Sequence, residues 1–329
     1  MKAIMHETYG FPEVLQYGEI DKPSPGDNEV LVEVHAASLN AGDLSDLKGR
    51  PLFIRLLYGL HKPRNTKLGY DFAGRVVQTG KKVKHFEPGD DVFGDLSSFG
   101  WGAFAEFVCA PEEAMTRKPA NATYEEAAAI PVAAQVALQG LRDKGRIKSG
   151  QHVLINGASG GVGTFAVQIA KSYDTQVTAV CSTKNIELVR AIGADYVIDY
   201  TREDFTKNGS HYDLILAANG NHSIFQYQRA LSKNGSLVVT GGSGTQFFQA
   251  LVLGPLLSAI GSQKMGAMLM RPSNRDLQFL QMLFKKGKIK SIIDRRYSLN
   301  QIAQAMQYLS EGHAKGKIII NIKSNIVKS

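Results

Sequence analysis

The chain has 329 residues, enough for two domains, and its apolar and charged fractions, 43% and 21%, are ordinary for a globular protein. Its two cysteines, Cys109 and Cys181, cannot build a disulfide framework or a four-cysteine zinc site. They fit a reducing compartment, for which we expect the cytoplasm. The net charge of +8 is not gathered in a basic run with interleaved aromatic residues, so we expect no nucleic-acid partner. We attribute the basic excess to solvated surface and to a site for a polyanionic small molecule.

The first 120 residues are predicted to be rich in β-strands. Residues 30–34 and 74–77 are short β-branched runs, and Gly and Pro mark turns at 23–26 and 88–90. Closely spaced strands with such turns are typical of a compact barrel rather than of a parallel sheet.

The pattern changes near Tyr124, from which strands and helices alternate. A helix is expected over 125–141, interrupted at Pro131. Further on, strands are expected at 152–156, 177–181, 196–198, 212–216 and 236–240, with helices at 162–173, 185–192 and 223–231. This alternation predicts a doubly wound parallel sheet with helices on both faces.

The last part of the chain returns to mixed structure. We expect helices at 273–286 and 299–310, and strands at 292–297 and 317–322. The predicted fold class is therefore α/β plus β: a β-barrel domain formed by 1–122 and 268–329, with a cofactor domain, 123–267, inserted. Lys317 is expected to pair with acidic residues at the surface.

The longest apolar stretch, residues 247–269, is interrupted by glycines, Pro255, Gln263 and Lys264. It is too interrupted for a membrane span, so we expect no integral membrane segment. The favoured interpretation is a buried or lid-like helix, and the alternative is a helix lying on a membrane surface.

A glycine-rich turn joins the strand expected at 152–156 to the helix that follows. Gly157, Gly160 and Gly163 keep the spacing of a dinucleotide fingerprint. Glycines allow a tight turn, and the first helical turn offers unpaired N–H groups and partial positive charge to a pyrophosphate. The alternative is a turn that needs glycine only for its geometry.

The residues after the second strand of this unit indicate which dinucleotide is bound. Sites that prefer NAD place Asp or Glu there, but no carboxylate occurs before Glu187. Ser182, Thr183 and Lys184 offer hydrogen-bond donors and a positive charge, which favours the 2′-phosphate of NADPH over NADH. The alternative is that Ser182 and Thr183 only cap the next helix.

Ligands bind outside the carboxyl ends of the strands of a parallel sheet, so the later strand ends are also expected to approach the cofactor. From these arguments the expected cofactor-binding residues are Gly157, Ser159, Gly160, Gly161, Val162, Gly163, Ser182, Thr183, Lys184, Ala218, Asn219, Gly241 and Gly242.

Several short motifs, in order along nearly the whole chain, carry a family resemblance. They lie at residues 37–43, 68–76, 86–92, 127–131, 157–163, 193–200 and 312–318. In this arrangement the chain resembles the medium-chain dehydrogenase/reductase superfamily, and within it the zinc-free branch of quinone and enoyl reductases. The resemblance implies a GroES-like barrel with an inserted Rossmann domain, and a homodimer formed through the Rossmann sheets. It also implies that Tyr200 lies by the adenosine phosphate.

The same resemblance bears on metal binding and on catalysis. Zinc-dependent relatives have a cysteine where this chain has Asn40, and a His-Glu pair where it has Tyr70 and Asp71. Asn and Tyr are poor zinc ligands, so we expect no metal. The expected catalytic residues are Asn40, to bond the nicotinamide amide or the substrate carbonyl, Tyr70, to donate a hydrogen bond to a developing oxyanion, and Asp43, to brace the loop. An alternative for Tyr70 is a packed tyrosine with a satisfied hydroxyl.

The resemblance and the residues together predict a zinc-independent oxidoreductase that transfers hydride from NADPH to a quinone or an α,β-unsaturated carbonyl compound. Two alternatives stay open at this stage. One is an NADPH-binding redox sensor or scaffold with little turnover, and the other is a zinc-type alcohol dehydrogenase with unusual ligands.

Overall fold

The computed structural model describes residues 1–52 and 54–323, and it divides into two compact units. The first unit comprises Met1–Val132, Pro272–Gly287 and Ser291–Ser329, and the second comprises Ala133–Arg271 and Lys288–Lys290. The first unit includes helix α3 (Tyr124–Ala128), which contacts strands β3 (Glu29–Ser38) and β4 (Asp71–Thr79) of that unit. The boundary predicted from the sequence lies after residue 122.

The first unit is built on a seven-stranded sheet in the order β14-β15-β3-β4-β5-β7, with β6 also paired to β3. All its pairs are antiparallel except β14 with β15. The strands are β3 (Glu29–Ser38), β4 (Asp71–Thr79), β5 (Asp91–Asp95), β6 (Phe107–Pro111), β7 (Met115–Arg117), β14 (Ile293–Ser298) and β15 (Lys317–Asn321). A separate antiparallel pair joins β1 (Lys2–Met5) to β2 (Gln16–Glu19).

The first unit contains several helices, and capping residues mark both ends of α1 (Ala41–Lys48). The longer ones are α1 (Ala41–Lys48), α2 (Ile54–Tyr58), α9 (Asn274–Lys285) and α10 (Ile302–Ser310), with short 3₁₀ turns at Pro12–Val14, Glu112–Ala114 and Leu299–Gln301. Asn40 and Asp43 form a capping box at the start of α1. Gly49, with φ of +56°, ends α1 in the left-handed conformation that favours glycine.

The second unit contains a six-stranded sheet in the order β10-β9-β8-β11-β12-β13, in which every pair is parallel. Its strands are β8 (His152–Asn156), β9 (Gln176–Cys181), β10 (Tyr196–Asp199), β11 (Tyr212–Ala217), β12 (Leu231–Val239) and β13 (Lys264–Ala267). The predicted parallel sheet is confirmed. The strand order reverses at β8, so the loops after β8 and β11 open where such sheets bind ligands.

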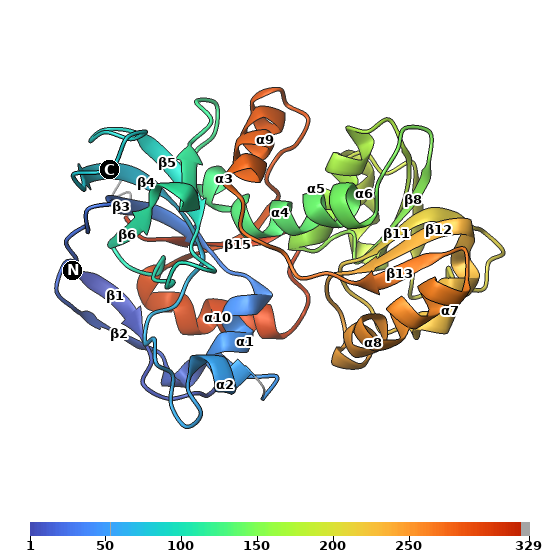
Figure 1. Ribbon diagram of the computed structural model, residues 1–329, viewed down its shortest axis with the longest axis horizontal. Coiled ribbons are helices and arrows are strands. Elements are labelled where there is room, and N and C mark those ends of the chain that lie inside the picture. Colours follow the sequence, from blue (N-terminus) through green and yellow to red (C-terminus); the bar gives the residue numbers. More distant parts are fainter. Residues whose placement is uncertain (53, 324–329) are drawn as a thin grey trace. The chain divides into compact units, whose positions relative to one another are not determined.

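The helices of the second unit cover both faces of its sheet. Figure 1 shows α5 (Gly161–Lys171) and α6 (Ile186–Ala191) on one side of the strands, and α7 (Ile224–Ala230) and α8 (Gly244–Ile260) on the other. The helix expected over 125–141 is two helices, α3 and α4 (Pro131–Gln139), and α4 continues into a π-helical turn, Gly140–Lys144. A short 3₁₀ turn, Thr183–Asn185, precedes α6.

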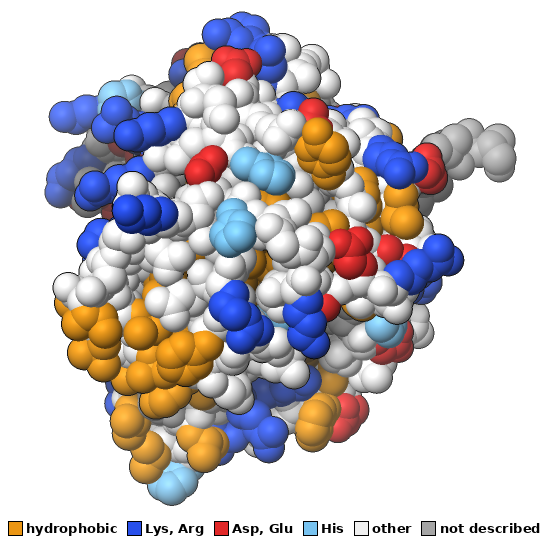
Figure 2. Space-filling model, turned by 90° about the vertical axis from the view of Figure 1, so that its right-hand side faces the viewer, with side chains coloured by type: hydrophobic (Ala, Val, Ile, Leu, Met, Phe, Trp, Pro, Cys, Tyr) orange, Lys and Arg blue, Asp and Glu red, His pale blue; other side chains and the backbone are white. Residues whose placement is uncertain are grey.

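The stretch 247–269 differs from its prediction in two ways. It contains strand β13, because an apolar run shows no periodicity that separates a helix from a strand. The buried-helix interpretation of α8 is wrong, because Leu256 is 61% and Ile260 86% exposed. Figure 2 shows hydrophobic side chains gathered at the lower left of the face it displays.

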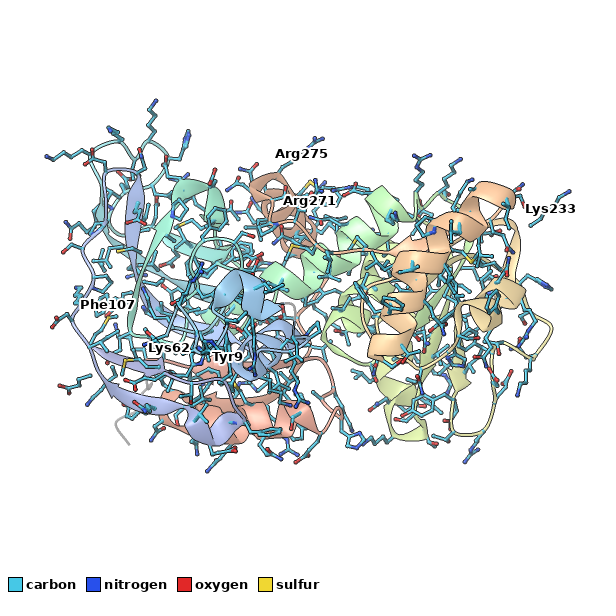
Figure 3. The ribbon with its side chains drawn as sticks, turned by 60° about the horizontal axis from the view of Figure 1, so that its bottom comes forward. Tyr9, Lys62, Phe107, Lys233, Arg271 and Arg275 are labelled. Carbon is cyan, nitrogen blue, oxygen red and sulfur yellow. The ribbon has the colours of Figure 1, made fainter. Side chains whose placement is uncertain are left out.

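Two further surface features bear on the composition of the chain. Lys233 and Arg275 are exposed, and Figure 3 shows their side chains extending away from the ribbon, as expected of a basic excess at a solvated surface. Every helix in the described part of the chain is too short or too polar to cross a bilayer.

Candidate functional site

The glycine-rich turn between β8 and α5 forms a cradle in which Gly157 and Gly163 cannot carry a side chain without strain. Gly157 has φ of +83°, and a Cβ on Gly163 would lie 2.1 Å from the carbonyl oxygen of Gly157. Gly160 is the N-cap of α5 and has no side chain to satisfy the first N–H groups of the helix. These N–H groups and the open cradle suit a pyrophosphate.

A buried hydrogen-bond network fixes two strand ends near this cradle. The amide nitrogen of Asn156, at the end of β8, donates to the hydroxyl of Tyr227 at 2.8 Å. Tyr227 donates to Gln246 Oε1 at 2.9 Å, and Gln246 Nε2 donates to the carbonyl of Gly241 at 2.9 Å. Because all three side chains are buried, this network holds the ends of β8 and β12 against α7 and α8.

The structure brings the predicted residues of the later strand ends close to the cradle. A Cβ on Gly157 would lie 2.6 Å from Cβ of Asn219, and a Cβ on Gly241 would lie 2.4 Å from the carbonyl oxygen of Ala218. Gly242 has φ of +98°, a conformation that favours glycine. These loops pack this closely because Gly157, Gly241 and Gly242 have no Cβ.

The ends of β9 and β10 carry the residues expected to distinguish NADPH from NADH. Lys184 is exposed, and Tyr200 is 59% exposed. Thr183 donates its hydroxyl proton to Asp199 at the end of β10. This hydrogen bond is the main reason that the pKa of Asp199 lies below its usual value. A carboxylate thus lies near the site, which the sequence argument missed because it considered only residues directly after β9.

Two further residues at this end were missed. Nε of Arg202 lies 3.6 Å from Oδ2 of Asp199, and the Arg202 side chain is 77% exposed. Asn185 is buried, and its amide nitrogen donates to the hydroxyls of both Ser159 and Ser182. An asparagine or arginine beside a strand end is too common in sequences to have indicated either one.

In the first unit, the carboxylate of Asp71 is fully buried and accepts four hydrogen bonds. Its Oδ2 accepts from Ser38 at 2.8 Å, from the amide of Asn40 at 2.9 Å and from the ammonium of Lys317 at 3.1 Å. Its Oδ1 accepts from the backbone N–H of Val132 at 3.0 Å. Lys317 is 2% exposed and also donates to Asn40 Oδ1 at 2.6 Å. The expectation that Lys317 pairs with surface acids was wrong, because β15 places it inside the unit.

Asp43 lies beneath the first turn of α1. Its Oδ2 accepts from the backbone N–H of Asn40 at 2.8 Å, and no described group donates to its Oδ1. Burial raises the pKa of this carboxyl well above its usual range. Asp43 is therefore tied to the position of Asn40 through the backbone.

Tyr70 donates its hydroxyl proton to Asp46, a residue of α1 that sequence reasoning missed. Both side chains are buried, at 8% and 7% exposure. Burial raises the pKa of Asp46 to about 6, although the bond from Tyr70 lowers it. Gly42 makes room for the pair, because a Cβ there would lie 2.6 Å from the ring of Tyr70.

No three His, Cys, Asp or Glu side chains gather to hold a metal ion within 1–52 and 54–323. Asn40 and Tyr70 have their polar atoms engaged with Lys317, Asp71 and Asp46.

Comparisons with known proteins identify the family to which the chain belongs. Residues 26–120 match the alcohol dehydrogenase GroES-like domain, and residues 192–320 match a model described as zinc-binding dehydrogenase. The chloroplast envelope quinone oxidoreductase homolog of Arabidopsis thaliana is 33% identical over 333 residues, which cover 97% of this chain and 98% of that one. The chain belongs to the medium-chain dehydrogenase/reductase superfamily.

Two further comparisons place the chain within this superfamily. The chloroplastic NADPH-dependent alkenal/one oxidoreductase of A. thaliana is 30% identical over 333 residues, covering 97% of this chain and 79% of that one. A solved structure, the quinone oxidoreductase from Coxiella burnetii, superposes with a TM-score of 0.87 at 29% identity, covering 98% of this chain and 99% of that one. The chain lies in the quinone oxidoreductase-like branch, so the predicted family is confirmed. The predicted fold class, a GroES-like barrel domain with an inserted Rossmann domain, is confirmed too.

Replacement of Lys317 by methionine tests whether the buried ion pair between Lys317 and Asp71 stabilises the first unit. The variant leaves the Asp71 carboxylate buried without its cation, which we expect to cost about 3–5 kcal/mol in the free energy of unfolding. Lys323→Met is the matched control, because Lys323 pairs with Glu33 at 3.0 Å but is 54% exposed, and its loss should cost at most about 1 kcal/mol. Chemical denaturation measures both. Equal losses would contradict the buried pair.

Proposed function

We propose that this superfamily member is a zinc-independent reductase that transfers hydride from NADPH to a quinone or an α,β-unsaturated carbonyl compound. As a member of the quinone oxidoreductase-like branch it is an oxidoreductase and uses a nicotinamide cofactor. The names of its relatives, which include a quinone oxidoreductase and an alkenal/one oxidoreductase, support the substrate class.

The preference for NADPH is supported mainly by the charge around the ends of β9 and β10. Ser182, Lys184 and Arg202 offer a hydroxyl and two cations there. The carboxylate of Asp199 is already bonded to two threonine hydroxyls and lies beside Arg202. This setting suits a 2′-phosphate better than a ribose hydroxyl, which requires a free carboxylate acceptor.

The cradle after β8 would hold the pyrophosphate, and the loops after β11 and β12 would border the ribose and the nicotinamide. Bound NADPH supplies hydride chemistry, and the protein supplies orientation. Tyr200 would lie beside the adenosine phosphate. The glycines at 157, 163, 241 and 242 support these roles, because a Cβ at any of them would collide with a neighbouring loop and change the shape of the site.

The catalytic roles that we propose lie in the first unit. Tyr70 holds a proton at Oη, and Asp46, with a pKa near 6, holds or releases a proton beside it. When Asp46 is protonated it can donate to Tyr70, whose own proton is then free for a developing oxyanion on the substrate. Asn40 keeps one amide hydrogen to donate to a carbonyl group, and Asp43 positions Asn40 through its backbone N–H.

The proposal that no zinc is used rests on the donor atoms. Where zinc-dependent relatives have cysteine and histidine, this chain has an amide and a phenol, each held by protein partners. Neither group is a good ligand for zinc. Metal analysis of the purified protein should find no stoichiometric zinc, and a full equivalent would instead support an alcohol dehydrogenase.

Oxidation of NADPH by purified protein is the direct test of function. Loss of reduced-nicotinamide absorbance is followed with a panel of quinones, enals and enones, and with NADH in parallel. We expect turnover with NADPH at least ten times as efficient as with NADH. Binding of NADPH without reduction of any acceptor would contradict the reductase and support a redox sensor.

The Tyr70–Asp46 pair should control the pH dependence of kcat. Because ionised Asp46 accepts the Tyr70 proton, the rate should fall as pH rises through about 6, and Asp46→Asn should remove this inflection. Tyr70→Phe should lower kcat about 100-fold below pH 6, where Asp46 is protonated and the Tyr70 proton is free to be donated. Tyr196→Phe, at an exposed position of the second unit, is the control. An unchanged rate in Tyr70→Phe would remove Tyr70 from the mechanism.

We also propose a homodimer formed through the second unit. The edge strand β13 has no partner on one side among the described residues, and the nearby helix α8 exposes Phe248, Leu251, Leu256 and Ile260. An open strand edge beside an apolar helix favours pairing with a second copy.

Light scattering after size-exclusion chromatography tests the dimer. We expect the mass of two chains, and a shift toward one chain in Leu256→Asp, because a charge would be buried in the interface. Leu60→Asp, at an equally exposed leucine of the first unit, should leave the mass unchanged. A monomeric parent protein would refute the proposal. The cytoplasm stays our predicted compartment, which cell fractionation would test.

A further inference from the structure

We propose that Asn185 is a positioning residue that turns the hydroxyl protons of Ser159 and Ser182 outward, so that both serines donate to phosphates of the bound dinucleotide. The inference rests on the proposed binding of NADPH at this site and names a residue that sets its specificity. Ser159 belongs to the glycine-rich cradle, and Ser182 follows β9.

The contacts come from one buried amide. Nδ2 of Asn185 lies 3.0 Å from Oγ of Ser159 and 3.2 Å from Oγ of Ser182. Asn185 is 6% exposed, whereas both serines are only partly buried. The turn Thr183–Asn185 sets this placement, since the backbone N–H of Asn185 donates to the carbonyl of Ser182 at 2.9 Å. The amide thus joins the pyrophosphate end of the site to the 2′-phosphate end.

The direction of the hydroxyl protons follows from donor and acceptor chemistry. An amide nitrogen has two hydrogens and no lone pair to offer, so Asn185 can only donate to the two serine oxygens. Each serine therefore accepts from Asn185 and keeps its own proton for another acceptor. No acceptor for either proton occurs among the described residues, so both protons are left for a ligand.

Thr183 shows the opposite arrangement only one residue away. Its hydroxyl donates to Asp199, so its proton is committed within the protein. Of the two hydroxyls predicted to meet a 2′-phosphate, only that of Ser182 is available as a donor. Lys184, which is exposed, adds charge but no fixed direction.

An amide is needed at position 185 rather than a carboxylate. Oδ1 of Asn185 is buried and accepts no hydrogen bond from the described residues, so the side chain's hydrogen bonds are the two that Nδ2 donates to the serines. A carboxylate of the same shape would accept from both serines, would turn their protons inward, and would add a negative charge beside the phosphates.

Direct binding of NADPH and NADH to Asn185→Asp, measured by calorimetry with the full chain, tests the proposal. Each lost hydrogen bond to a charged group weakens binding about ten-fold or more. We expect a loss of about 100-fold for NADPH and a smaller loss for NADH, which lacks the 2′-phosphate. Asn208→Asp adds the same charge at an exposed asparagine of the second unit and should bind both as the parent does.

Serine variants separate positioning from a general effect of the substitution. Ser182→Ala should weaken NADPH alone, and Ser159→Ala should weaken both dinucleotides. In the Ser159→Ala/Ser182→Ala background, Asn185→Asp should cost clearly less affinity than it does in the parent protein, because only the added charge still acts. Thermal unfolding of each variant confirms that it is folded.

Two results would overturn the inference. One is wild-type NADPH affinity in Asn185→Asp, which would also arise if the amide were turned the other way. The other is an undiminished effect of Asn185→Asp in the double-serine background. Failure of the proposed function is distinct from both, since it is seen as tight binding of NADPH with no acceptor reduced. A parent protein that prefers NADH would refute the Ser182 role and leave Ser159 as its own test.

Discussion

The buried carboxylate of Asp71 is the constraint on which the first unit depends. It receives hydrogen bonds from the end of β3, the N-cap of α1, the start of β15 and the start of α4, segments far apart in the sequence. A buried carboxylate without these donors would destabilise the fold. Each donor is held in place because it makes a hydrogen bond to this carboxylate. Asn40 is held here, which is why the first turn of α1 has a defined position.

The second unit solves a similar problem with neutral groups. Asn156, Tyr227 and Gln246 form a buried chain of hydrogen bonds that joins β8, α7 and α8, and glycines let the surrounding loops meet backbone to backbone. The result is a rigid rim around an open cradle. Asn185 extends the same principle to the rim itself, because its amide decides in which direction two hydroxyl protons point. Preorganised donors bind an anion without paying to be ordered first.

Much of this was readable from local pattern. The alternation of strands and helices predicted the parallel sheet, and the glycine spacing with its flanking strand and helix predicted the cradle. The local argument was weaker where apolar residues follow one another without a period: β13 was missed, and α8, expected to be buried or lid-like, is exposed at Leu256 and Ile260. Lys317 was predicted to lie at the surface because lysine is rarely buried. Its partner Asp71 is distant in the sequence, so no local pattern indicates the pair.

The sequence by itself determined the family, the two kinds of fold and the segments that form the cradle, because these depend on periodicity and on residue types at short spacing. Only the tertiary structure decided which polar groups meet. Asp71 with Lys317, Tyr70 with Asp46, Thr183 with Asp199 and Asn185 with Ser159 are pairs between residues 16 to 246 positions apart. The pKa shifts caused by burial, and the directions in which hydroxyl protons point, depend on which groups meet in the folded protein. They therefore exist only once the chain has folded.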